Sequence, residues 1–111
     1  MKGTSVTPPE MWGGIECTVT RIGDGYVDQT FLSGHEHRES DLHAFAGLGI
    51  RAIRYPVLWE RVAPDGLAKA DWRWTDKRLA TIRNPGVRPI AGLLHHGSGP
   101  RETSLAEPDF P

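Results

Sequence analysis

The stretches "GIRAI" at residues 49–53 and "GVRPI" at residues 86–90 repeat one junction, a glycine that leads directly into an apolar run. Glycine commonly ends a helix because it adopts the left-handed backbone without strain. The copies lie about one helix plus one strand apart, which indicates a repeated β-α unit. Units of this kind with helical crossovers build a parallel sheet, and binding groups lie in the loops after its strands.

Three strands and two helices are predicted around this repeat. The strands cover residues 11–17, 50–59 and 87–94. Pro56 marks the point at which the second strand stops pairing. The spacing of apolar residues predicts helices over residues 36–48 and 76–83.

Capping residues predict where the helices start, and polar stretches predict the loops. Ser33 and Glu36 have the spacing of a capping box for the first helix. Thr75 is placed to cap the second helix. Residues 18–32 and 60–74 are expected to be long loops, since the first is polar and the second contains the turn signal "APDG".

Polar side chains stand at the predicted ends of the three strands, namely Glu16, Arg54 and His95. Parallel strands end at the same edge of a sheet, so these side chains should meet at one rim. The predicted fold class is α/β, a partial (β/α)8 barrel with three parallel strands and two helices. Three strands leave open edges, so residues 11–111 are expected to be a barrel fragment that self-associates or lacks its remainder.

Composition excludes several classes of partner. The 111 residues carry a formal net charge of -1 with basic and acidic residues interspersed, which argues against nucleic acid. No apolar run reaches the ~20 residues that cross a bilayer, so no membrane is expected. Residues 1–10 lack the apolar core of a signal peptide and are expected to be a disordered leader. With a single cysteine, Cys17, the expected compartment is the cytoplasm.

Three segments, in order, resemble the N-terminal part of family 1 glycoside hydrolases, the β-glucosidase type of (β/α)8 barrel. They are "MWGGIECTVTRIG" (11–23), "GIRAIRYPVLWERVAPDG" (49–66) and "GVRPIAGLLHHGSGP" (86–100). The second segment has five residues in the family's places: Arg54, Trp59, Arg61, Pro64 and Gly66. The resemblance implies a retaining glycosidase that hydrolyses O-glycosidic bonds.

The third segment also departs from the family. His95 matches the family's sugar-binding histidine, but His96 stands where tryptophan is usual and Gly97 where an acid is usual. With these departures the chain resembles a divergent branch of glycosidase-like barrels. Members of that branch precede a dTDP-4-dehydrorhamnose reductase-type domain in fusion proteins. The resemblance implies no cofactor for this portion, since a nicotinamide would belong to the reductase domain.

A retaining glycosidase needs two carboxyl groups about 5 Å apart. The family carries them in an Asn-Glu-Pro and a Glu-Asn-Gly motif, and neither motif occurs in this chain. Glu107 precedes a proline but follows a polar loop instead of a strand. No catalytic residue is therefore assigned, and the chain alone is expected to be inactive. It would contribute the sugar-binding rim of a glycosidase, or form a non-catalytic carbohydrate-binding module.

Five residues are candidates for substrate binding: Arg54, His95, Glu16, Trp59 and His96. Arg54 would keep a catalytic carboxylate ionised or pair with an acid inside the barrel. His95 would bind a sugar hydroxyl or serve a structural role. Glu16 would accept hydrogen bonds from hydroxyls or pair with Arg54. Trp59 would stack on a sugar ring or fill the core, and His96 beside His95 cannot point the same way.

Two other kinds of site compete with this hypothesis. The "HEH" run at residues 35–37 suggests a metal, but no third ligand follows at a recognised spacing. "HGSG" at residues 96–99 after the third strand is similar to the oxyanion loop of α/β hydrolases. That fold needs a G-x-S-x-G elbow, which is absent here, so only a truncated hydrolase would fit.

Overall fold

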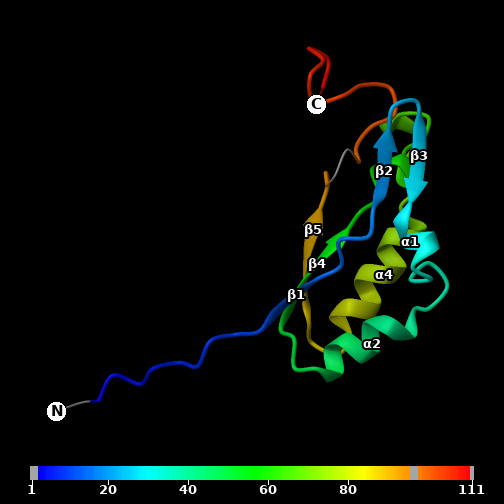
Figure 1. Ribbon diagram of the computed structural model, residues 1–111. Helices are drawn as coiled ribbons and strands as arrows, with labels where there is room; N and C mark the ends of the chain where they lie inside the picture. Colours follow the sequence, from blue (N-terminus) through cyan, green and yellow to red (C-terminus); the bar gives the residue numbers. More distant parts are fainter. Residues whose placement is uncertain (1–2, 96–97, 111) are drawn as a thin grey trace.

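A three-stranded parallel sheet organises the protein, as seen in a computed structural model that describes residues 3–95 and 98–110. Its strands are β1 (Trp12–Gly14), β4 (Ala52–Pro56) and β5 (Arg88–Gly92), in the order β1-β4-β5 (Figure 1). The α/β fold class is confirmed, and the arrangement is consistent with part of a (β/α)8 barrel. Each strand is shorter than predicted, and β4 ends at Pro56 as expected.

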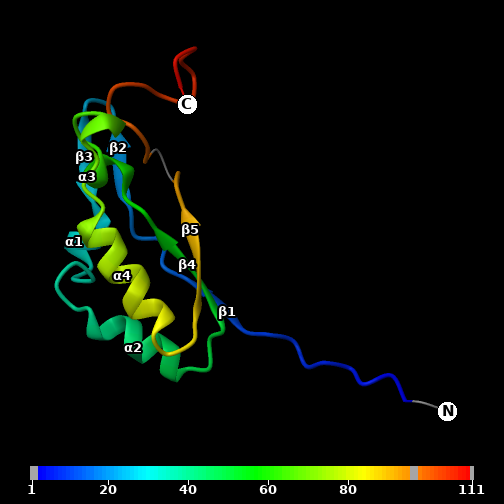
Figure 2. The same ribbon diagram turned by 180° about the vertical axis from the view of Figure 1, so that it is seen from behind.

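Two helices cover one face of this sheet, α2 (Ser40–Gly47) and α4 (Arg73–Arg83) (Figures 1 and 2). Leu42 of α2 and Ile82 of α4 are buried against Ile53 and Tyr55 of β4. Side chains alternate along a strand, so Arg54 lies on the opposite face. Neither view shows a helix over that face.

The repeated glycine junction has the conformation that the sequence predicted. Gly49 and Gly86 end α2 and α4 with φ of +87° and +88°. A side chain would strain this left-handed backbone, so glycine is favoured at both positions.

The prediction of a polar loop over residues 18–32 is wrong. Strands β2 (Val19–Ile22) and β3 (Gly25–Asp28) form an antiparallel hairpin, followed by the one-turn helix α1 (Gln29–Leu32). Gly23 with φ of +60° supports a two-residue turn, which suits the twist of paired strands. The Asp28 carboxylate accepts a hydrogen bond from the Phe31 amide (3.0 Å) and caps α1.

The prediction of a capping box is also wrong, because neither of its two residues caps α2. Ser33 ends α1, and the Glu36 carboxylate forms an ion pair with Arg61. Arg61 also contacts Asp28 and lies over the ring of Trp74 (5.3 Å to the centroid). These contacts hold the chain before α2 in a non-helical conformation, so α2 starts only at Ser40.

The predicted loop over residues 60–74 contains structure, and the second helix starts earlier than expected. The loop includes the one-turn helix α3 (Trp59–Val62) and the short helix η1 (Leu67–Lys69). Thr75 lies inside α4 and does not cap it; its hydroxyl donates to the Val57 carbonyl (3.3 Å). This bond ties α4 to the end of β4.

Strand β5 has an open edge among the described residues. The Arg88 amide donates to the Arg51 carbonyl (2.9 Å), and the Gly92 carbonyl accepts from the Val57 amide (3.0 Å). In a parallel ladder alternate residues face the same neighbour, so Pro89 and Ala91 face the open edge. Pro89 has no N–H to offer there, as is usual for edge strands.

Residues 3–10 run away from the sheet in an extended path (Figure 1). The Glu10 carboxylate pairs with Arg88 at the start of β5 and accepts from the Trp12 indole (2.7 Å). Among the described residues, no helix has the length and apolar character needed to cross a membrane.

Candidate functional site

One carboxylate joins the three strands of the parallel sheet. Glu16 Oε2 lies 3.1 Å from Nη2 of Arg54 and 2.7 Å from Nε2 of His95. Glu16 follows β1, Arg54 belongs to β4, and His95 follows β5. We call this cluster of Glu16, Arg54 and His95 the rim.

Strand register places the first two members of the rim. Arg54 pairs in register with Gly14 and with Ile90, so it is the middle residue of β4 and not its end as expected. Its carbonyl accepts from the Ile15 amide (2.9 Å), which carries the chain in register to Glu16. A Cβ on Gly14 would lie only 3.0 Å from Glu16 Oε1, so glycine leaves room for the carboxylate.

Three hydrogen bonds to the His95 backbone fix this residue after the end of β5. Its amide donates to the Ser98 hydroxyl (2.8 Å), and its carbonyl accepts from the Ser98 amide (3.0 Å). The Thr18 hydroxyl also donates to that carbonyl (3.4 Å). These bonds fix the backbone from which the His95 side chain reaches Glu16.

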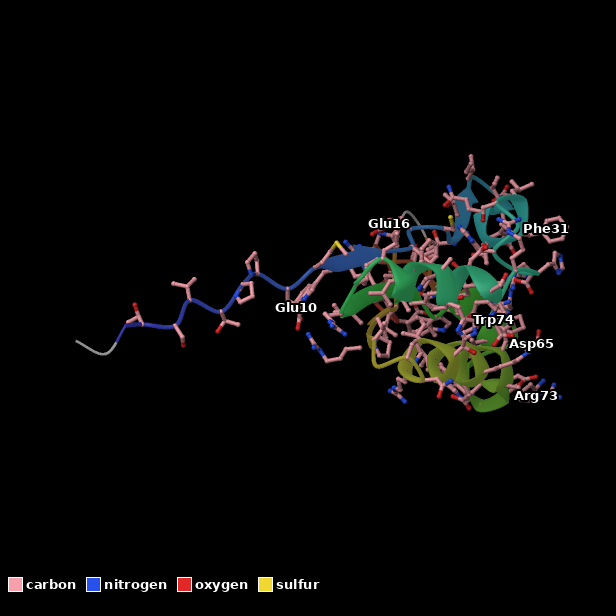
Figure 3. The ribbon with its side chains drawn as sticks, turned by 90° about the horizontal axis from the view of Figure 1, so that it is seen from below. Glu10, Glu16, Phe31, Asp65, Arg73 and Trp74 are labelled. Carbon is pink, nitrogen blue, oxygen red and sulfur yellow. The ribbon has the colours of Figure 1, made fainter. Side chains whose placement is uncertain are left out.

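The rim is open to solvent. Side-chain exposure is 57% for Arg54, 47% for Glu16 and 26% for His95. Exposed ion pairs of this kind stabilise a fold by at most about 1 kcal/mol. In Figure 3, Glu16 lies apart from Trp74, which comes from α4 on the helical side of the sheet. The rim thus presents a carboxylate acceptor and cationic or ring N–H donors on the face without helices.

Trp59 lies elsewhere. It starts α3, its ring packs against Phe110 (6.4 Å between centroids), and it lines an apolar pocket of about 200 Å³ with Trp72 and Leu93. The structure therefore does not bring Trp59 to the rim. The remaining candidate, His96, lies outside the described residues.

Glu60, a residue that no sequence motif singled out, is only 3% exposed. Its Oε1 accepts a hydrogen bond from the Gly99 amide. Burial raises the pKa of this carboxyl, and the nearby Asp28 raises it further, while its own amide, the Gly99 amide and Arg101 act to lower it. Glutamate is rarely buried, so the only available signal was its place between the family-matching residues Trp59 and Arg61.

The histidines considered for a metal have other partners. His35 Nδ1 lies 2.7 Å from Asp41 Oδ2, and the His37 ring stands edge-on to Phe31 at 5.5 Å. Within residues 3–95 and 98–110, no group of three histidine, cysteine or acidic side chains is placed to hold a metal ion.

A large hollow lies away from the rim. It has a volume of about 660 Å³ and lies between the turn of the hairpin and residues 98–110. Arg101 on one of its walls stacks over the Tyr26 ring (4.8 Å to the centroid). None of the three rim residues lines this hollow.

Several β-glucosidases are similar to this chain. No family model and no solved structure matches the chain. The chain is 27% identical over 97 residues to β-glucosidase A of Acetivibrio thermocellus, which covers 85% of the chain and 20% of that protein. It is 37% identical over 79 residues to β-glucosidase 4 of Oryza sativa subsp. japonica, and this match covers 68% of the chain and 16% of that protein. It is 25% identical over 88 residues to thermostable β-glucosidase B of Thermobispora bispora, and this match covers 77% of the chain and 19% of that protein.

The chain thus spans about a fifth of the length of these curated relatives. The comparisons do not support a fusion to a reductase domain, and the relatives favour the glycosidase hypothesis over a truncated α/β hydrolase. Over most of its length, the chain is related to the β-glucosidases of glycoside hydrolase family 1.

Proposed function

We propose that the rim binds the hydroxyl groups of a glycoside, as one part of a glucosidase-like barrel. The observation that carries this proposal is the Glu16 carboxylate, which Arg54 and His95 hold on the open face of the sheet. A carboxylate accepts hydrogen bonds from hydroxyls, and the exposed Arg54 guanidinium has further N–H groups that donate to sugar oxygens, while His95 holds Glu16 in place. Hydroxyl pairs of a pyranose offer both kinds of partner.

The low stabilising value of the rim supports a binding role. Exposed ion pairs contribute little to folding, and the hydrophobic core lies on the other face of the sheet. The glucosidase relatives are consistent with a sugar as ligand.

For a longer protein of which this chain is one part, we propose retaining hydrolysis of O-glycosidic bonds. The two carboxyl groups that this reaction needs would come from other segments, because the chain contains neither family motif. The 111-residue chain itself is then a non-catalytic carbohydrate-binding unit. A hydrolysis assay on 4-nitrophenyl β-D-glucopyranoside should give no rate above background.

Titration of the isotope-labelled 111-residue chain with methyl β-D-glucopyranoside, followed by NMR, tests the binding proposal. We expect saturable shifts of the Ser98, Gly99 and Arg54 amides, and a weakening of at least tenfold in the Glu16→Gln variant. The substitution keeps the shape of the side chain but removes the charge that binds Arg54 and orders the rim.

Glu10→Gln is the matched control. Glu10 is also an exposed glutamate paired with an arginine, Arg88, but it lies where the strands begin, at the other end of the sheet from His95. The control should bind the glycoside like the unaltered chain. Equal weakening in both variants, or no saturable shift at the rim in the unaltered chain, contradicts the proposal.

A further inference from the structure

We propose that Glu60 is a positioning residue for the rim: its buried carboxyl anchors the Gly99 amide and thereby sets where the His95 imidazole meets Glu16. This inference deepens the proposed function and rests on it for the identity of the site. The anchor itself is a feature of the fold that is testable without any sugar.

The first step is the burial of Glu60 on α3. Leu58 precedes the helix in a left-handed conformation with φ of +60°, and both Leu58 and Val62 are buried. This one-turn helix is therefore packed on more than one side, and Glu60 points inward at 3% exposure. A buried carboxyl is stable only when its oxygens find donors.

The second step is the donor that Glu60 finds in a distant part of the chain. The Gly99 amide donates to Oε1, whereas Oε2 is buried without a hydrogen-bond partner among the described residues. Ser98, Gly99 and Pro100 are all buried. The bond therefore fixes a buried stretch of the chain to α3, and its strength depends on the charge of Glu60.

The third step leads from Gly99 to the rim. Ser98, adjacent to Gly99, exchanges two hydrogen bonds with the His95 backbone (2.8 and 3.0 Å). The His95 ring in turn lies 2.7 Å from Glu16. Thr18 also donates to the His95 carbonyl (3.4 Å). Of the two contacts that hold the His95 backbone, through Thr18 and through Ser98, only the one that leads to Glu60 includes a titratable group.

The charged groups whose fields reach Glu60 are few in the described part of the chain. Arg101 after β5 favours the carboxylate, and Asp28 at the end of β3 opposes it. Burial has the larger effect and raises the pKa of Glu60. The anchor should therefore strengthen as Glu60 ionises, at a pH above its ordinary pKa of 4.5.

NMR of the unaltered 111-residue chain, recorded as a function of pH and without sugar, gives the first test. The Gly99 amide proton and the His95 amide proton should share a transition with the Glu60 side-chain carbon. Glu60→Gln keeps an acceptor oxygen and should abolish that transition, while the nuclear Overhauser effect between the His95 and Glu16 side chains persists. Glu102→Gln, an exposed acid in the same segment, should leave the transition intact.

Loss of the acceptor gives the second test. Glu60→Leu should reduce the His95–Glu16 Overhauser effect by more than half, and Glu60→Gln should restore it. A Gly99 transition that His95 does not follow would overturn the positioning role, as would an unchanged Overhauser effect in Glu60→Leu. If that variant does not fold, the pH titration of the unaltered chain still decides. Absence of sugar binding would leave these results standing, so the two proposals fail separately.

Discussion

The imidazole of His95 and the carboxylate of Glu16 lie 2.7 Å apart, although one follows β5 and the other follows β1. Strand β4 lies between these two strands and contributes Arg54 to the same carboxylate. A contact that spans the full width of the sheet requires all three strands to run in the same direction and in the observed register. Its properties therefore report both on the fold and on the proposed site.

Glu16→Gln should change stability little. Both of its partners are on the solvent-exposed face, and exposed pairs contribute at most about 1 kcal/mol. Urea unfolding should give a free energy of unfolding within about 1 kcal/mol of the unaltered chain. A loss of several kcal/mol would show that the rim is a structural element and not a binding surface.

Glu60→Gln should stabilise the chain near neutral pH. The folded-state pKa of Glu60 is raised above its ordinary value of 4.5 because burial disfavours the charge. Its stabilising contribution is therefore complete below the unfolded-state pKa and is lost as the pH rises through the folded-state pKa. Each unit of pKa difference corresponds to about 1.4 kcal/mol.

Urea midpoints measured between pH 4 and pH 8 check this sign. The unaltered chain should lose stability relative to Glu60→Gln across the range in which Glu60 ionises. The difference should level off at higher pH. A variant that becomes relatively less stable as the pH rises would mean that the ionised carboxylate is the favoured buried form.

Two glycine-to-alanine substitutions should have opposite effects on the stability of the chain. Gly86→Ala should destabilise the chain by about 1 kcal/mol, since φ of +88° strains any residue with a Cβ. No atom lies within 4 Å of the added Cβ, so backbone strain is the only cost. Gly47→Ala, inside α2 and also without near neighbours, should stabilise by about 0.5–1 kcal/mol. Thermal unfolding of the pair measures both, and equal signs would contradict the assigned backbone.

Self-association should depend on the open edge of β5. Ala91 faces this edge and is exposed, and its neighbour Pro89 already removes one donor there. Ala91→Lys places a charge at the edge, which opposes pairing with another strand. Sedimentation velocity should show a larger species at high concentration for the unaltered chain and less of it for the variant. The same distribution in both would exclude β5 as the contact.

The parallel sheet was predictable from the repeated glycine-to-strand junction, because this pattern depends on local backbone preferences. The hairpin was not predicted, although "Ile-Gly-Asp-Gly" at residues 22–25 carries a two-residue turn signal between β-branched runs. The many polar residues of this stretch favoured the prediction of a loop. Glu36 has the sequence spacing of a cap but is held by Arg61, and such a tertiary ion pair leaves no local signal.

The site was partly predictable for the same reason. Parallel topology brings Glu16 and Arg54 together, and hydrogen bonds from Ser98 and Thr18 then place His95 beside them. The position of Trp59 depends instead on α3. The single turn of this helix follows Leu58, whose left-handed conformation is not predicted by any sequence pattern. The burial of Glu60 follows from that same turn.

The most direct test of the rim is a crystal structure of the 111-residue chain in complex with methyl β-D-glucopyranoside. The rim proposal predicts sugar hydroxyls within hydrogen-bond distance of the Glu16 carboxylate and of Arg54 or His95, on the face of the sheet opposite α2 and α4. A sugar bound only in the hollow beside residues 98–110, or strands in which Glu16 and His95 no longer meet, would contradict it.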